Sequence, residues 1–302
     1  MVLWLEDSII ATHLEDTRYS DSTMCICVSR IEVSMRFDVW KWLVAKDDFL
    51  LSAIECIWSA KNLYGLRNLK WRRIANDLIK KHKLETEGRD VVIVLNGPSV
   101  KEQPLERLKG KDLIFVNQGF RLPAYKELQP KYHVFIDSKL IHGVWDIKWL
   151  DEIHDMNPNI NFVMPASWAR LSLLEPYIQK GYQIIWLDSC IGGLRGLGVS
   201  GACFDLARAL KYATIYFTGF EATSFAASLL KTSSHFYGND ADEASMTASD
   251  VMKGYYMNAR QIRELILVAE AFERLHVNVV NLTNGGLLSM FPRKRFEEVF
   301  PA

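Results

Sequence analysis

Seven short, mostly apolar runs recur between residues 91 and 281, and stretches with helical spacing separate them. Several runs are continuous and bounded by Gly, Pro, Asn or Asp, as expected for strands buried on both faces. Strands that alternate with helices favour a parallel sheet covered on both sides. The sequence therefore predicts an α/β fold with a doubly wound, mainly parallel, Rossmann-like sheet. The expected strands are Val91–Leu95, Leu113–Val116, His133–Ile136, Asn161–Met164, Gln183–Leu187, Thr214–Thr218 and Val277–Asn281, and the expected helices are Leu105–Lys109, Trp168–Lys180, Ser200–Leu210 and Asn258–Leu275.

The region before residue 89 lacks this strand pattern. Phe49–Lys83 has apolar residues at helical spacing, which predicts an N-terminal helical region (1–88) before one α/β catalytic domain (89–302). Residues 61–83 mix apolar side chains with Lys and Arg. That mixture suits a helix lying on an anionic membrane surface. It equally suits a helix that packs its apolar stripe on the core, which is the commoner arrangement.

Composition narrows the classes of function. The 302 residues include 36 Lys plus Arg and 36 Asp plus Glu, so net charge does not favour nucleic acid as a partner. Hydrophobic residues make up 49%, enough for a sizeable core. An odd number of cysteines without zinc-site spacing predicts reduced thiols in a cytoplasmic protein. The five are Cys25, Cys27, Cys56, Cys190 and Cys203.

Membrane crossing is not expected. The sequence opens on acidic residues rather than on a basic segment with a long apolar one, unlike a secretory signal. No apolar run approaches the roughly 20 residues that a spanning helix needs. We therefore expect a protein that is neither exported nor inserted in the bilayer.

The first expected strand ends in the loop Asn96-Gly97-Pro98-Ser99. Open α/β sheets bind ligands at the carboxyl ends of their strands, where free backbone N–H groups hold phosphate. The same four residues also suit a tight turn with a serine cap. The segment by itself leaves both interpretations open.

Polar residues also follow three later strands. Asn117-Gln118 follow the second, Asp137-Ser138 the third and Gly219-Phe220-Glu221 the sixth. Side-chain amides suit base edges, ribose hydroxyls and phosphate oxygens. One crevice would gather all of these groups, whereas the alternative is that each caps its own turn.

A glycine-rich stretch from Ile191 to Gly201 leads into an apolar helix. It lacks the Lys-Ser/Thr end of a Walker motif and does not keep dinucleotide spacing, which disfavours an ATPase and a Rossmann dehydrogenase. We expect Ser200 and Gly201, at the start of the helix, either to contact an anion or to cap the helix.

Five segments follow one another in an ordered series. They are Asn96-Gly97-Pro98-Ser99 with Lys101-Glu102, Asn117-Gln118, Ser200-Gly201, Gly219-Phe220-Glu221, and Ser234-His235-Phe236-Tyr237-Gly238. In this order, over about Asp90 to Pro292, the chain resembles the bacterial lipooligosaccharide sialyltransferases of glycosyltransferase family 42. The resemblance implies a glycosyltransferase-A-like domain that uses a CMP-activated sugar and neither cofactor nor metal. The donor-binding residues that it implies are Asn96, Gly97, Pro98, Ser99, Asn117, Gln118, Ser200, Gly201, Gly219, Phe220 and Glu221.

The chain departs from the family pattern at two positions. Asp137 stands where the family has Asn, and a carboxylate beside the donor phosphate would repel it unless paired or bridged by a metal. Asn239 stands where the family has its catalytic His. We therefore take His235 as the candidate base, because a neutral imidazole accepts a proton near neutral pH. Tyr237 is expected to bind the donor phosphate, and Asp240 or Asp242 would be the next candidates for the base.

The leading hypothesis is transfer of sialic acid or a related sugar from a CMP-activated donor to a hydroxyl of a glycan or glycolipid, in lipopolysaccharide biosynthesis. The protein would then be cytoplasmic, with peripheral contact to the inner membrane and homo-oligomerisation left open. A second hypothesis is an ATP- and Mg²⁺-dependent enzyme that resembles the pterin pyrophosphokinase-like family, which Asp137 would support. A third is a nucleotide- or glycan-binding module without catalysis.

Overall fold

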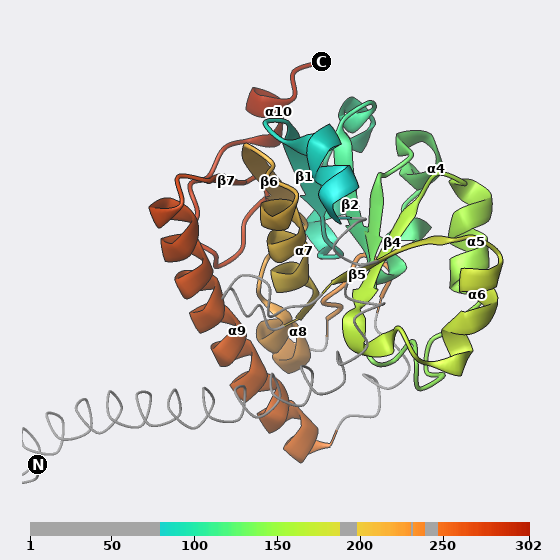
Figure 1. Ribbon diagram of the computed structural model, residues 1–302. Coiled ribbons are helices and arrows are strands. Elements are labelled where there is room, and N and C mark those ends of the chain that lie inside the picture. The colour runs from blue at the N-terminus through green and yellow to red at the C-terminus, as the bar shows by residue number, and fades with distance from the viewer. Residues whose placement is uncertain (1–78, 188–197, 231, 239–246) are drawn as a thin grey trace, which may run out of the picture. The chain divides into compact units, whose positions relative to one another are not determined.

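A single sheet of seven parallel strands forms the centre of the computed structural model, which describes residues 79–187, 198–230, 232–238 and 247–302 (Figure 1). The strands are β1 (Asp90–Val94), β2 (Asp112–Val116), β3 (Tyr132–Val134), β4 (Asn161–Pro165), β5 (Gln183–Leu187), β6 (Thr214–Thr218) and β7 (Asn278–Asn281). Their order in the sheet is β5-β4-β3-β2-β1-β6-β7, and every neighbouring pair is parallel. The predicted parallel α/β fold is confirmed.

Helices cover both faces of the sheet, because consecutive residues of a strand point to opposite sides. In β1, Val92 and Val94 belong to one core cluster and Val91 and Ile93 to the other, and all four are buried. The first cluster takes in residues of α4 (Tyr125–Leu128), α5 (Trp149–Met156), α6 (Glu175–Gln179) and α10 (Phe296–Val299), and the second takes in residues of α7 (Gly198–Ala209) and α9 (Ala248–Arg274). The remaining elements are α8 (Ser224–Leu230) and the short 3-10 helices η1 (Pro98–Glu102), η2 (Leu105–Leu108), η3 (Asn117–Arg121), η4 (Ala166–Trp168) and η5 (Ser172–Leu174).

All seven predicted strands are present, but the helices differ from their predicted bounds. The helix expected over Trp168–Lys180 is instead η4, η5 and α6, because Pro176 has no N–H and fits only the first turn of a helix. The helix expected from Asn258 starts ten residues earlier, at Ala248. There Thr247 accepts the Asp250 N–H at 3.3 Å and donates its own N–H to the Asp250 carboxylate at 3.0 Å, a capping box. The expected helix at Leu105–Lys109 is the 3-10 helix η2.

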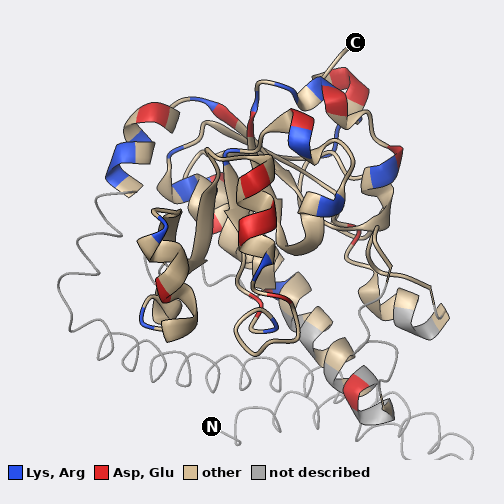
Figure 2. Cartoon of the chain, turned by 90° about the vertical axis from the view of Figure 1, so that its right-hand side faces the viewer, with Lys and Arg blue, Asp and Glu red and all other residues tan. Residues whose placement is uncertain are grey.

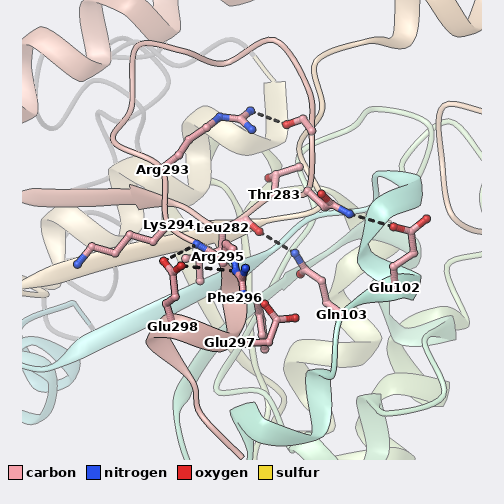
Figure 3. Close-up of a pocket in the computed structure, with 12 residues that line it drawn as sticks. Glu102, Gln103, Leu282, Thr283, Arg293, Lys294, Arg295, Phe296, Glu297 and Glu298 are labelled. Atoms are coloured by element: carbon pink, nitrogen blue, oxygen red, sulfur yellow. Dashed lines mark hydrogen bonds and ion pairs between the residues drawn. The ribbon is translucent and has the colours of Figure 1, made fainter.

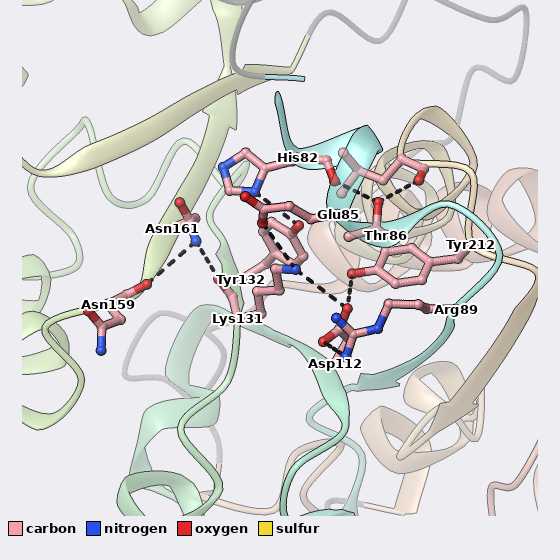
Figure 4. A network of polar contacts seen from close by, with 11 residues as sticks. His82, Glu85, Thr86, Arg89, Asp112, Lys131, Tyr132, Asn159, Asn161 and Tyr212 are labelled. Carbon is pink, nitrogen blue, oxygen red and sulfur yellow. Dashed lines mark hydrogen bonds and ion pairs between the residues drawn. The ribbon is translucent and has the colours of Figure 1, made fainter. Parts of the chain in front are cut away.

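The amino ends of β1, β2 and β3 carry a network of charged and polar groups around the buried Asp112 (Figure 4). Asp112 is its centre: it pairs with Arg89 at 3.0 Å and with Lys131 at 3.6 Å, and it accepts the Tyr212 hydroxyl at 2.8 Å. Residues 79–86 form a helix that joins this network, since Thr86 donates to the Leu210 carbonyl at 2.6 Å. Every partner of Asp112 is therefore supplied from within the protein.

Three sequence expectations fall largely outside the described residues. Of the expected helical region 1–88 the structure describes only residues 79–88, and of the five cysteines only Cys203, which is buried with a free thiol. In the part of the chain that is described, none of the helices combines the length and the apolarity needed to cross a bilayer. Lys and Arg lie among Asp and Glu in the view of Figure 2, so the described residues of that side gather into no extended basic face.

Candidate functional site

A cavity of about 170 Å³ lies at the carboxyl ends of β1, β2 and β6. β1 pairs with β2 on one side and with β6 on the other, so the order of strands reverses between β1 and β6. Ligands of open α/β sheets bind at this reversal point. The cavity lining includes eight residues that the sequence singled out, namely Asn96, Gly97, Asn117, Ser200, Gly219, Phe220, Glu221 and His235.

The other expected donor-binding residues do not line the cavity. Pro98 is exposed, whereas Ser99, Gln118 and Gly201 are buried. Pro98, Gln118 and Gly201 are each next to a lining residue in the sequence, and Ser99 lies two residues from the lining residue Gly97. The structure thus brings parts of all the donor-binding segments together without exposing each of their residues to the cavity.

Two backbone N–H groups of the first loop already have partners within the protein. The Gly97 N–H donates to the Gly219 carbonyl at 2.7 Å, and the Ser99 N–H donates to Glu221 Oε1 at 2.8 Å. The Val100 N–H donates to the Gly97 carbonyl at 3.2 Å, and Pro98 has none to offer. The carboxylate of Glu221 therefore occupies the place where a phosphate was expected.

Two glycines permit the close approach of this loop to the segment after β6. A Cβ atom on Gly97 would lie 1.6 Å from Glu221 Oε2 and 2.6 Å from the Gly219 carbonyl oxygen. Gly219 has φ +68°, and a Cβ there would lie 2.5 Å from the Leu95 carbonyl oxygen. Side chains at either position would separate the two loops that form this wall of the cavity.

Two asparagines at the cavity have buried oxygens without a hydrogen-bond partner. Asn96 donates its Nδ2 to the Val116 carbonyl at 3.2 Å, which fixes the orientation of its amide because a carbonyl only accepts. Asn96 Oδ1 and Asn117 Oδ1 have no partner. Buried polar atoms are nearly always hydrogen-bonded, so these two acceptors call for a water or a ligand with donor groups.

The long helix α9 supplies a lining residue that the sequence did not indicate. Gln261 donates to Ser200 Oγ at 3.3 Å across the cavity wall. Ser224, in the first turn of α8, also lines the cavity and donates to Asn258 of α9 at 2.7 Å. Both α9 residues lie in a helical stretch in which the sequence indicated no site residue. Only their tertiary contacts identify them.

His235 lies at the cavity because its neighbour is tied to the first loop. The Phe236 N–H donates to the Asn96 carbonyl at 2.8 Å. The His235 ring stacks on Tyr237, with ring centroids 5.0 Å apart and an interplanar angle of 17°. Tyr237 itself packs on the hydrophobic core and does not line the cavity. Asn239, Asp240 and Asp242 lie outside the described residues.

Asp137 does not line the cavity either. Its Oδ1 accepts the Lys139 N–H at 2.9 Å, a contact that closes the turn after β3. Among the residues that the structure describes, no three His, Cys, Asp or Glu side chains lie close enough to hold a metal ion together. The carboxylate at the cavity is that of Glu221.

A second and larger cavity, of about 420 Å³, lies beside β7 (Figure 3). Its polar side chains are mostly satisfied by one another: Asn284 donates to Glu102 at 3.1 Å, Gln103 donates to the Leu282 carbonyl at 2.7 Å, and Arg295 pairs with Glu298 at 3.5 Å. None of the expected site residues lines it. We therefore take the smaller cavity as the candidate site.

Comparisons with known proteins find distant structural similarities only. No model of a protein family matches the sequence, and no curated protein matches it. The chain is similar to the Maf glycosyltransferase from Magnetospirillum magneticum AMB-1 at 12% identity and a TM-score of 0.45, over 69% of this chain and 34% of that one. It thus spans about a third of that protein's length.

A second similarity is to the sialyltransferase CstII from Campylobacter jejuni, solved in complex with the substrate analogue CMP-3FNeuAc. The identity is 18% and the TM-score 0.39, over 68% of this chain and 84% of that one. Both similarities are too low to transfer a substrate, or a role, to any residue of this chain.

Proposed function

We propose that the protein is a glycosyltransferase that moves sialic acid or a related sugar from a CMP-activated donor to a hydroxyl of a glycan acceptor. The observation that supports this most is the cavity at the sheet reversal, where the segments that resemble family 42 in their order, although far apart in sequence, come together. The unpartnered oxygens of Asn96 and Asn117 at its wall suit a ligand rich in hydroxyl and amino groups.

The charges of the cavity suggest how the donor lies in it. Ser200 is in the first turn of the 12-residue helix α7, where N–H groups and the helix dipole favour an anion. Glu221 is a carboxylate on the β6 side and would repel phosphate. We therefore place the donor phosphate toward Ser200 and the ribose hydroxyls toward Glu221, which accepts hydrogen bonds.

His235 is the group that we assign to the chemistry. Its imidazole takes the proton of the acceptor hydroxyl while that oxygen bonds to the anomeric carbon of the donor sugar, and the bond from that carbon to the phosphate oxygen breaks. CMP leaves with the electron pair. No cofactor or metal takes part in this step.

A panel of nucleotide sugars tests the proposal. We expect CMP-sialic acid to raise the melting temperature and to be turned over with a glycan acceptor, whereas UDP- and GDP-sugars do neither. His235→Ala should lower kcat by a factor on the order of 10²–10⁴ while the Kd of CMP changes little.

The same panel includes ATP with Mg²⁺. Consumption of ATP without turnover of any CMP-sugar would overturn the proposal in favour of the pyrophosphokinase-like reaction. Binding of a CMP-sugar without turnover by the wild type, over a range of acceptors, would instead favour a binding module.

A further inference from the structure

A histidine that the sequence did not single out lies directly behind the cavity. His133 is fully buried in β3, and its Nε2 lies 2.8 Å from the backbone carbonyl oxygen of Asn117. Its Nδ1 lies 2.9 Å from the hydroxyl oxygen of Tyr125, which is also fully buried. Both ring nitrogens therefore have one partner each.

The partners fix the tautomer of His133. A carbonyl oxygen only accepts, so Nε2 carries the hydrogen and donates to Asn117. Burial lowers the pKa of His133 to about 3, and the bond to the Asn117 carbonyl offsets this only in part. The ring is then neutral, and Nδ1 accepts the hydrogen of the Tyr125 hydroxyl. His133 has no free site with which to carry a proton to the cavity.

Asn117 is held in an unusual backbone conformation at the cavity. Its φ is +45°, in the left-handed region that residues other than glycine adopt seldom, although asparagine tolerates it better than most. It follows β2 directly, and its buried Oδ1 has no partner. A strained residue persists where its surroundings determine it, and His133 supplies one such contact from the neighbouring strand.

We propose that His133 is a positioning residue, which holds Asn117 in the conformation that receives the nucleotide. This inference rests on the proposed function. His133 touches no substrate and acts only through the Asn117 carbonyl. The hydrogen bond from His133 to the Asn117 carbonyl spans 16 residues of sequence and connects the adjacent strands β3 and β2. It therefore fixes one wall of the cavity to the core of the sheet.

Titration with CMP tests the inference in the full-length protein. His133→Phe keeps the buried ring but removes the donor, and we expect the Kd of CMP to rise about tenfold. His133→Gln restores an N–H donor and should recover most of the affinity. Val163→Ala is the matched control: Val163 is fully buried and lies in β4, which does not pair with β2, so the substitution should lower stability without changing the Kd.

A double-mutant cycle separates positioning from general damage. In an Asn117→Ala background, His133→Phe should have no further effect on the Kd of CMP, because the side-chain amide that His133 positions is gone, although the backbone carbonyl that it bonds remains. Equal losses in the two backgrounds would overturn the inference.

The inference also has a readout without ligand. If the wild type does not bind CMP, the proposed function fails, and a crystal structure of ligand-free His133→Phe then decides the positioning role. Asn117 should leave the left-handed region in that variant. A φ that stays near +45° would show that His133 does not hold it.

Discussion

The two ends of the sheet differ in whether their buried polar groups have partners within the protein. At the amino end, Asp112 has three partners and every charge of the network is paired within the protein. At the carboxyl end, Asn96 and Asn117 keep oxygens without partners beside a cavity. Buried polar groups that are satisfied internally stabilise the fold, whereas unsatisfied ones beside a cavity remain for a ligand. We therefore expect the amino end to contribute stability and the carboxyl end to bind a ligand.

Removing the centre of the amino-end network gives the largest expected effect. Asp112→Asn removes the counter-charge of Arg89 and leaves Lys131 with Glu85 alone. Because Arg89 is half exposed, the loss in the free energy of unfolding should lie at the low end for a buried pair, about 3 kcal/mol. Urea unfolding measures this. The exposed pair of Glu87 and Lys211 serves as the control, and Glu87→Gln should change nothing measurable. Weaker CMP binding by folded Asp112→Asn would contradict the expectation that the amino end affects stability alone.

A second buried carboxylate, Asp205 of α7, lacks the partners that Asp112 has. Its Oδ1 makes no hydrogen bond, and burial raises its pKa to about 7, which Arg208 at 3.9 Å offsets only in part. The folded state therefore binds this proton more tightly than the unfolded chain, whose carboxyl titrates near 3.8.

The contribution of Asp205 to stability should consequently fall as the pH rises from about 4 to 7, by an amount on the order of 2–4 kcal/mol. The lowered pKa of His133 acts in the opposite direction between about pH 3 and 6.5, so the prediction concerns the difference between the wild type and Asp205→Asn, which melting temperatures across this range measure. A wild-type profile equal to that of Asp205→Asn would show that Asp205 ionises freely.

Gly97→Ala tests how closely the cavity loops must approach. The new Cβ would clash with the Gly219 carbonyl and with Glu221, so we expect a loss of about 1–3 kcal/mol in stability and at least tenfold weaker CMP binding. Gly254→Ala in α9 is the matched control, because a Cβ there meets open space. It should be neutral or stabilising by up to about 1 kcal/mol. Unchanged CMP binding by Gly97→Ala would remove this loop from the site.

Substitution of one asparagine at each end of the sheet compares the two ends with the smallest change in structure. Asn157, near the amino end, donates to the Pro130 carbonyl at 2.7 Å and accepts the Asn159 N–H at 3.2 Å. Asn157→Ala should cost about 2 kcal/mol of stability and leave CMP binding unchanged. Asn96→Ala loses one hydrogen bond and should cost about 1 kcal/mol, but it should weaken CMP binding about tenfold. Calorimetry and urea unfolding of the pair measure both quantities, and the reverse pattern would contradict the comparison.

The local sequence pattern predicted the positions of the strands well and the bounds of the helices less well. A buried parallel strand is a short apolar run, and all seven runs are strands in the structure. The break at Pro176 and the start of α9 at Thr247 depend on single residues within otherwise helical stretches, so periodicity placed these bounds wrongly. Asp137 shows a further limit at the site, because an aspartate side chain can either accept an N–H within its own turn or contact a ligand, and only the structure distinguishes the two.

The sequence by itself determined the parallel α/β fold and the strand-end segments that meet at the cavity, because both follow from residues that are close together along the chain. The tertiary structure decided which polar groups of those segments already have hydrogen-bond partners within the protein. Glu221 reaches the Ser99 N–H over 122 residues because β6 lies beside β1, and His133 reaches Asn117 because β3 lies beside β2. Hydrogen bonds between segments depend on the order of strands in the sheet, which the spacing of residues along one chain does not specify.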